Sequence, residues 1–95
     1  MHASIRTYEA SDPREVARRA SHGFVPILRG TPGFIAYYVV DRGDGTIASV
    51  SVFEDQAGTD ESTRRAAEWV ADNIAELVVS GPKVVAGEVT VEARR

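Results

Sequence analysis

The fold of this chain is decided by one stretch of its sequence, GFIAYYVVDRGDGTIASVSVFED at residues 33–55. Residues 33–41 are dense in the aromatic and β-branched side chains that favour strands. Residues 41–46 are rich in Asp and Gly, which supply the positive φ angles that a tight turn requires. In 46–54, Ala and Val alternate with Ser, as in a strand with two unlike faces. The stretch therefore predicts a β-hairpin.

Upstream of the hairpin, the sequence predicts a strand over 3–9 and then a helix. The segment Asp12-Pro13-Arg14-Glu15 opens that helix, with an N-cap, a first-turn proline and a capping-box glutamate. Pro26 lacks the N–H that a helix interior needs, so we expect the helix to kink or break near Gly23. The apolar stripe of this helix is Val16, Ala17, Ala20, Phe24, Ile27 and Leu28.

Downstream of the hairpin, Asp55 can cap a second helix that we expect to continue to about Val78. The segment Ser80-Gly81-Pro82 is a helix-ending signal, and 83–93 then predicts the last strand. The apolar stripe of this helix is Thr63, Ala66, Ala67, Val70, Ile74 and Leu77.

The predicted order of elements is β-α-β-β-α-β over a single domain, residues 1–95. This order is typical of the ferredoxin-like α+β fold, a four-stranded antiparallel sheet with two helices on one face. The second strand lies at a sheet edge in that fold, where proteins usually place charges or bulges. Here both faces of the strand are apolar from Phe34 to Val40. We therefore expect a second copy to cover the open face; a monomer with an unusually apolar sheet is the alternative.

Composition narrows the functional classes. The chain has 95 residues, 43% of them apolar and 26% charged, as in folded globular domains. It has no Cys, which excludes disulfide scaffolds, thiolate metal sites and thiol nucleophiles. A net charge of −3 argues against binding nucleic acid, and the longest apolar run, 34–40, is too short to cross a membrane. The N-terminus shows no signal-peptide pattern. We therefore expect a cytoplasmic protein with neither nucleic acid nor membrane as a partner.

Three local motifs resemble those of a known group of proteins. They are PILRGTPGF at 26–34, VSVFED at 50–55 and RRAAEWV at 64–70. They resemble the antibiotic biosynthesis monooxygenase-like group of the dimeric α+β barrel superfamily. The resemblance implies a homodimer whose sheets face each other, with a cavity between the sheet and helices of each subunit for a flat apolar or aromatic molecule. Members of the group include cofactor-free oxygenases that act on polycyclic phenols, haem degraders, lactone isomerases and proteins without known activity.

The haem-degrading members rely on an Asn near the first strand, a Trp and a helical His that binds iron. Here Trp69 is present, but the single Asn is Asn73, late in the second helix, and that helix contains no His. His2 lies at a terminus, and His22 falls on the outer helix face near several Arg side chains. We therefore expect no haem, no metal ion and no other cofactor.

The candidate ligand-binding residues are aromatic and polar. Tyr and Trp combine an apolar ring with a hydrogen-bonding tip, which suits a pocket for a planar or phenolic ligand. Tyr37 and Tyr38 point to opposite faces, so at most one lines a given cavity. Arg6 shares a strand face with Tyr8 and is suited to orienting an anionic or enolate oxygen. These rings could equally fill the core and the dimer interface. The tentative set is Arg6, Tyr8, Tyr37, Tyr38, Trp69 and Asn73, with no catalytic residue assigned.

Two functions are compatible with these residues. The first is a cofactor-independent monooxygenase or isomerase acting on small planar or aromatic molecules. The second is a non-catalytic dimeric module that binds a small molecule or serves as an accessory, because the sequence offers no matched acid–base pair. A hollow of about 300 Å³ or more between sheet and helices would favour a ligand site, whereas a packed interface would favour the accessory module.

Overall fold

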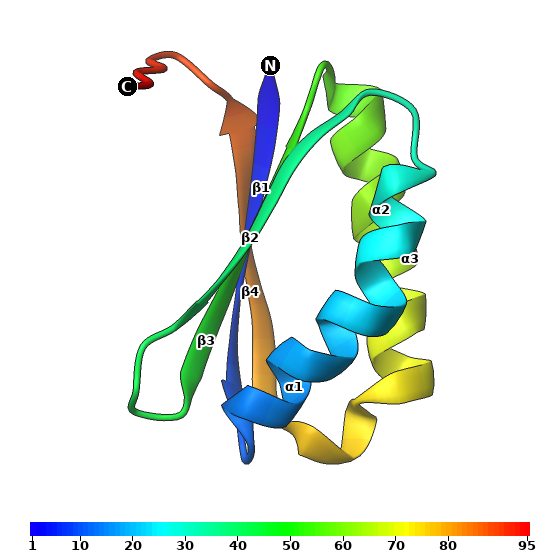
Figure 1. The fold of residues 1–95 in the computed structure, drawn as a ribbon, viewed down its shortest axis with the longest axis vertical. Helices are drawn as coiled ribbons and strands as arrows, with labels where there is room; N and C mark the ends of the chain where they lie inside the picture. Colours follow the sequence, from blue (N-terminus) through cyan, green and yellow to red (C-terminus); the bar gives the residue numbers. More distant parts are fainter.

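A computed structural model describes residues 1–95 and shows a four-stranded antiparallel sheet with all of its helices on one face (Figure 1). The strand order is β2-β3-β1-β4, so β2 lies at an edge as predicted. The predicted β-α-β-β-α-β architecture is confirmed. Its elements are β1 (His2–Ala10), α1 (Pro13–Arg19), a π-helical turn (Ala20–Phe24), α2 (Val25–Arg29), β2 (Phe34–Asp41), β3 (Thr46–Phe53), α3 (Gln56–Asn73), a 3₁₀ turn (Ala75–Leu77) and β4 (Val78–Glu88).

The β2–β3 hairpin forms as its turn chemistry predicts. Asp41 pairs with Ile47, and the loop between them contains Gly43 and Gly45, both with φ of +89°. Only glycine adopts such angles at little cost, so these two residues allow the chain to reverse. The Asp41 carboxylate accepts a hydrogen bond from the Gly43 N–H at 2.9 Å, which tightens the turn.

The start of α1 confirms half of the predicted capping box. The Glu15 N–H donates to Asp12 Oδ1 at 3.2 Å, so Asp12 is the N-cap. The Glu15 carboxylate does not return a bond to Asp12. It accepts from Arg18 Nε at 2.5 Å and from Arg19 Nε at 3.1 Å instead, because both guanidinium groups lie within one helical turn.

The predicted kink or break near Gly23 takes the form of the π-helical turn at Ala20–Phe24. Its backbone closes with the Val25 N–H donating to the Ala20 carbonyl, five residues earlier. Pro26 follows in the first turn of α2, where its missing N–H costs little. The widened turn therefore lets the helical path continue past the proline to Arg29.

The predicted ends of the second helix and the last strand are wrong. Helix α3 ends at Asn73 because Ile74 leaves the helical conformation, with φ of −135°, and its side chain is buried in the core. Strand β4 spans Val78–Glu88 rather than 83–93. Gly81 lies where β4 pairs irregularly with β1. A Cβ at this position would lie 2.8 Å from the Thr7 carbonyl oxygen, so only glycine fits between the two strands. The glycine marks a close approach of two strands rather than a helix end.

The buried face of α3 is also rotated from the predicted stripe. Ala67, which was placed in the stripe, is exposed, whereas Ser62 and Trp69 are buried against the sheet. The rotation brings hydroxyl side chains, as well as apolar ones, into the layer between sheet and helices. The buried apolar core is Ala10, Val16, Ala20, Phe24, Leu28, Ile47, Phe53, Ala66, Trp69 and Ile74.

Candidate functional site

A cavity of about 40 Å³ lies between the sheet and the helices. Its walls are mostly apolar and come from every layer of the fold, including Val16 of α1, Ile47 of β3 and Val70 of α3. The side chains with polar atoms on its wall are Arg6, Tyr8, Tyr37, Ser49 and Trp69. This volume suits one or two water molecules, whereas a cavity that holds benzene is about 150 Å³. Side chains therefore nearly fill the cavity in this conformation.

The structure brings together four of the six predicted ligand-binding residues. Strand β1 contributes Arg6 and Tyr8, β2 contributes Tyr37, and α3 contributes Trp69. These positions are up to 63 residues apart in the chain, from Arg6 to Trp69, and they meet because both strands and the helix present one face to the same layer.

The other two predicted residues lie elsewhere. Tyr38 is 61% exposed on the opposite face of the sheet, as the alternation between neighbouring strand residues requires. Asn73 is exposed at the end of α3, where its side-chain amide donates to the Trp69 carbonyl at 2.9 Å. Asn73 therefore closes the last turn of the helix and does not reach the cavity.

Arg6 is the one charged side chain in this cavity wall, and it is only 2% exposed. Its Nη2 donates to Thr63 Oγ1 at 3.0 Å and to Ser62 Oγ at 3.4 Å. Its Nε is buried without a hydrogen-bond partner. No carboxylate pairs with it, because every ion pair of the molecule involves other Arg residues, on α1, the hairpin loop, α3 and the C-terminal segment. Arg6 is thus a buried cation surrounded by neutral groups.

The two tyrosines beside Arg6 are neutral donors at neutral pH. Burial raises the pKa of Tyr37 to about 12, and the nearby Arg6 charge opposes this rise only in part. Burial likewise raises the pKa of Tyr8, again against the effect of Arg6. Removal from water lowers the pKa of Arg6, and the phenols oppose that shift. The cavity wall contains no His, Asp or Glu, so it offers hydrogen-bond donors and a positive charge but no matched acid–base pair.

Trp69 separates the cavity from the protein surface. Inside, its ring lies 5.5 Å from that of Phe24, which in turn contacts Tyr37 edge-on at 5.8 Å. Outside, it lines a groove between α2 and α3, which we call the outer groove. A Cβ on Gly23 would lie 3.0 Å from Trp69 Nε1, so the π-helical turn packs closely on the indole. The outer groove comprises Ile27, Arg64, Arg65, Glu68, Trp69, Asp72 and Asn73.

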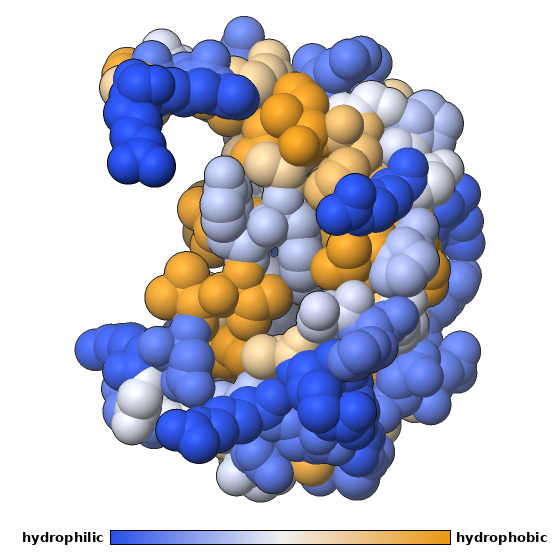
Figure 2. Space-filling model, viewed as in Figure 1, coloured by the Kyte–Doolittle hydropathy of each residue, from blue (hydrophilic) through white to orange (hydrophobic).

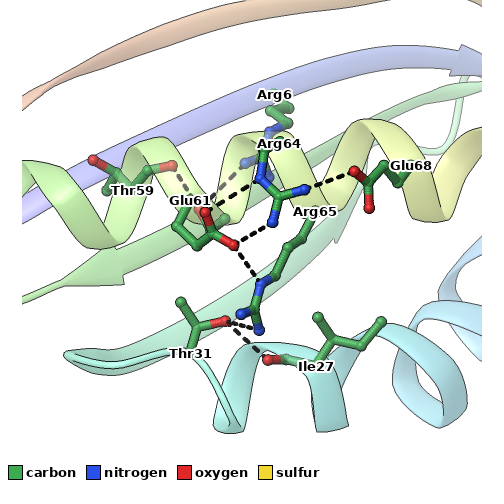
Figure 3. Close-up of polar contacts among 9 residues, drawn as sticks. Arg6, Ile27, Thr31, Thr59, Glu61, Arg64, Arg65 and Glu68 are labelled. Atoms are coloured by element: carbon green, nitrogen blue, oxygen red, sulfur yellow. Dashed lines mark hydrogen bonds and ion pairs between the residues drawn. The ribbon is translucent and has the colours of Figure 1, made fainter.

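A polar network holds the end of α2 against α3 beside the outer groove (Figure 3). Glu61 accepts from Arg64 Nη2 at 2.5 Å and from Arg65 Nε at 2.8 Å. Arg65 Nη1 also donates to Thr31 Oγ1 at 3.1 Å, and that hydroxyl donates to the Ile27 carbonyl at 2.9 Å. One guanidinium therefore connects the two helices.

Sequence reasoning missed the hydroxyl groups of the site. Ser49 lines the cavity and Ser51 is fully buried, although their alternation with Ala and Val is typical of a solvent-facing row. Ser62 and Thr63 accept hydrogen bonds from Arg6, and only Thr63 was in the predicted inward stripe. The available signal was the position of Ser62 one helical turn before Ala66, on the side of α3 that carries Trp69.

Comparison with known proteins finds solved structures with a similar fold. No protein-family model matches the sequence, and no curated protein matches it. A monooxygenase from the gene ActVA-Orf6 of Streptomyces coelicolor, solved in complex with nanaomycin D, superposes with a TM-score of 0.78 at 17% identity, over 99% of this chain and 91% of that one. The fold is the same. SnoaB, a cofactor-independent oxygenase from Streptomyces nogalater, superposes with a TM-score of 0.77 at 10% identity, over 99% and 97% of the two chains.

A protein of unknown function from Nitrosomonas europaea, NE2512, is also similar, with a TM-score of 0.76 at 23% identity, over 99% of this chain and 93% of that one. The resemblance to antibiotic biosynthesis monooxygenase-like proteins that the three motifs suggested is therefore confirmed at the level of the fold. At these identities the likeness establishes the fold alone. What the cavity binds depends on the residues that line it and not on the fold.

Proposed function

We propose that this protein is a homodimeric, cofactor-independent monooxygenase-like protein that acts on small planar or aromatic molecules in the cavity between its sheet and helices. The observation that supports the proposal most is the placement of Arg6, a buried guanidinium without an acidic partner, in a mostly apolar cavity that Trp69 lines. The fold is shared with SnoaB, a cofactor-independent oxygenase, and with the ActVA-Orf6 monooxygenase, which was solved with nanaomycin D.

The residues of the cavity suit such a ligand in complementary ways. The rings of Trp69 and Phe24 offer flat apolar surfaces for a planar body. The phenol groups of Tyr8 and Tyr37 and the guanidinium of Arg6 can donate to an oxygen of the ligand and polarise it. In a site from which water is excluded, such fixed donors act more strongly than they would in solution.

Ligand entry requires the cavity to widen, because about 40 Å³ is less than a single aromatic ring needs. Trp69 lines both the cavity and the outer groove, so its indole lies between the two. We propose that rotation of this indole, with movement of the adjoining π-helical turn, admits the ligand. π-helical turns within α-helices often occur at functional sites.

The alternative is a non-catalytic dimeric module that binds a small molecule or serves as an accessory. Two observations favour it: the absence of His, Asp and Glu from the cavity wall and the small volume of the cavity. Oxygen uptake with quinol-type substrates distinguishes the two functions. For a monooxygenase we expect uptake that Trp69→Phe reduces about tenfold or more and that Tyr38→Phe, on the opposite face, leaves unchanged.

Uptake that is absent from the wild-type protein with every quinol tested, while the same quinols bind, would support the binding module instead. Uptake that is equal in the wild-type and Trp69→Phe proteins would contradict the placement of the reaction in this cavity.

The homodimer part of the proposal is supported by the outer face of the sheet. One row of side chains crosses all four strands on that face, and we call it the outer row: Tyr38, Val50, Ile5 and Val85. Its members at the two edges are 61% and 68% exposed. Figure 2 shows hydrophobic residues along the sheet side of the molecule and a hollow beneath the C-terminal segment. A second copy seated there would remove this apolar surface from water.

The cytoplasmic location of the protein stays a prediction.

A further inference from the structure

The inner face of the sheet carries polar side chains where a core is expected to be apolar. Ser4 and Arg6 on β1 pair directly with Ser51 and Ser49 on β3, so the four side chains form one block facing α3. Ser4, Ser51 and Arg6 are each at most 2% exposed. Three buried atoms of this block have no hydrogen-bond partner: Ser4 Oγ, Ser51 Oγ and Arg6 Nε.

This arrangement is costly unless something else completes it. A buried donor without an acceptor carries a free-energy penalty, and a buried charge without a counter-charge carries a larger one. Arg6 carries both penalties, and its two protein partners, Ser62 and Thr63, are neutral hydroxyls. Such unpaired polar groups are rare in folded proteins, and ionisable groups in unusual surroundings cluster at functional sites.

The protein itself offers nothing to neutralise Arg6. The titratable groups that act on it are the phenols of Tyr8 and Tyr37, and α1 and α3 present Val16, Ala66 and other apolar residues to the same cavity. The outer row, which we propose a second copy covers, lies on the other side of the sheet. A counter-charge for Arg6 would therefore have to come from outside the chain.

We propose that Arg6 is an oxyanion subsite, and that the molecules this cavity binds are planar or aromatic acids with an ionised oxygen, a carboxylate or a phenolate. The inference rests on the proposed function and specifies the ligand class of the same site. Arg6 Nε supplies the free donor, the guanidinium supplies the charge, and Tyr8 and Tyr37 supply further donors that stay protonated. A guanidinium binds a carboxylate with two parallel hydrogen bonds, which gives direction as well as charge.

The test compares benzoate with benzamide, two probes with the same ring and nearly the same shape, of which only benzoate is charged. Trp69 is the single Trp of the chain, so ¹⁵N-labelled protein has one indole N–H signal, and that signal comes from the cavity wall. We expect benzoate to shift this signal saturably, with an affinity about tenfold or more above that of benzamide. We also expect benzoate, but not benzamide, to shift the Arg6 Nε–H signal.

Variants assign the preference to Arg6. Arg6→Gln should reduce the benzoate-to-benzamide affinity ratio to about one, whereas Arg42→Gln, which removes a charge from the exposed hairpin loop, should leave the ratio unchanged. Arg6→Lys keeps the charge but loses the planar fork, so it should retain a reduced preference. If Arg6→Gln does not fold, the benzoate-to-benzamide affinity ratios of Arg6→Lys and of the wild-type protein still test the role of Arg6.

Equal binding of benzoate and benzamide by the wild-type protein would overturn the oxyanion subsite and leave the cavity as a site for neutral planar molecules. A benzoate preference that survives in Arg6→Gln would also overturn the role of Arg6. No shift of the Trp69 signal with either probe would overturn both this inference and the proposed ligand-binding cavity.

Discussion

At the scale of single residues, the burial of Tyr37 has a measurable consequence for stability. Its pKa is about 12 in the folded protein and about 10 in the unfolded chain. Below pH 10 both states keep the proton, so the full stability is present. As the pH rises from 10 through 12, the unfolded state loses its proton first, and stability falls. We expect a loss on the order of 1–2 kcal/mol across that window, measured by urea unfolding at several pH values.

The control for this prediction is the neighbouring tyrosine. Tyr37→Phe should weaken the dependence of stability on pH above pH 10 and leave the contribution of Tyr8, whose pKa burial also raises, whereas Tyr38→Phe, on the outer face of the sheet, should leave the dependence in place. The same steep loss in Tyr37→Phe as in the wild-type protein would show that another group is responsible.

At the scale of elements, the packing of α3 on β3 depends on one glycine. A Cβ on Gly58 would lie 2.7–2.9 Å from side-chain atoms of Phe53, which is fully buried. Gly58→Ala therefore forces either the phenyl ring or the first turn of α3 to move, and we expect it to lower the free energy of unfolding by about 1–3 kcal/mol. Chemical denaturation at one protein concentration measures the loss.

Gly30→Ala is the matched control, because a Cβ there would meet the nearest atoms at 3.6 Å, an ordinary contact, and φ is −84°. It should change the stability by less than about 1 kcal/mol, in either direction. Equal effects of the two substitutions would mean that the loss does not come from the contact with Phe53.

At the scale of the whole molecule, the outer row predicts the oligomeric state. We expect sedimentation equilibrium at micromolar concentration to give about twice the monomer mass of 10.3 kDa. A charge placed in a desolvated apolar interface is costly, so Val85→Glu and Tyr38→Glu should each shift the protein to the monomer. Ala67→Glu places the same charge on the exposed side of α3 and should leave the dimer intact. A stably folded wild-type monomer at these concentrations would refute the dimer.

Much of this fold was predictable because the signals involved are local. The hairpin follows from Asp and Gly at 41–46, and the helix starts follow from Asp12 and Asp55, whose carboxylates accept N–H groups three residues ahead. Pro26 likewise indicated an irregular helix. Each of these features depends on bonds within a few residues, so the local sequence is sufficient to predict it.

Which face each element turns toward the core depends on contacts between residues that are distant in sequence. The alternation of Ser with Ala and Val in β3 indicated that the strand has two unlike faces. It did not indicate which face packs against α3, and that choice buries Ser51 and exposes the outer row. The end of α3 and the start of β4 were misjudged because Gly81 serves a contact with β1, distant in sequence. Four of the candidate residues, Arg6, Tyr8, Tyr37 and Trp69, meet at one cavity, and their role in binding stays a prediction. That Arg6 has no acidic partner was not predictable, because a counter-charge can come from anywhere in the chain, and only the packed molecule shows that none does.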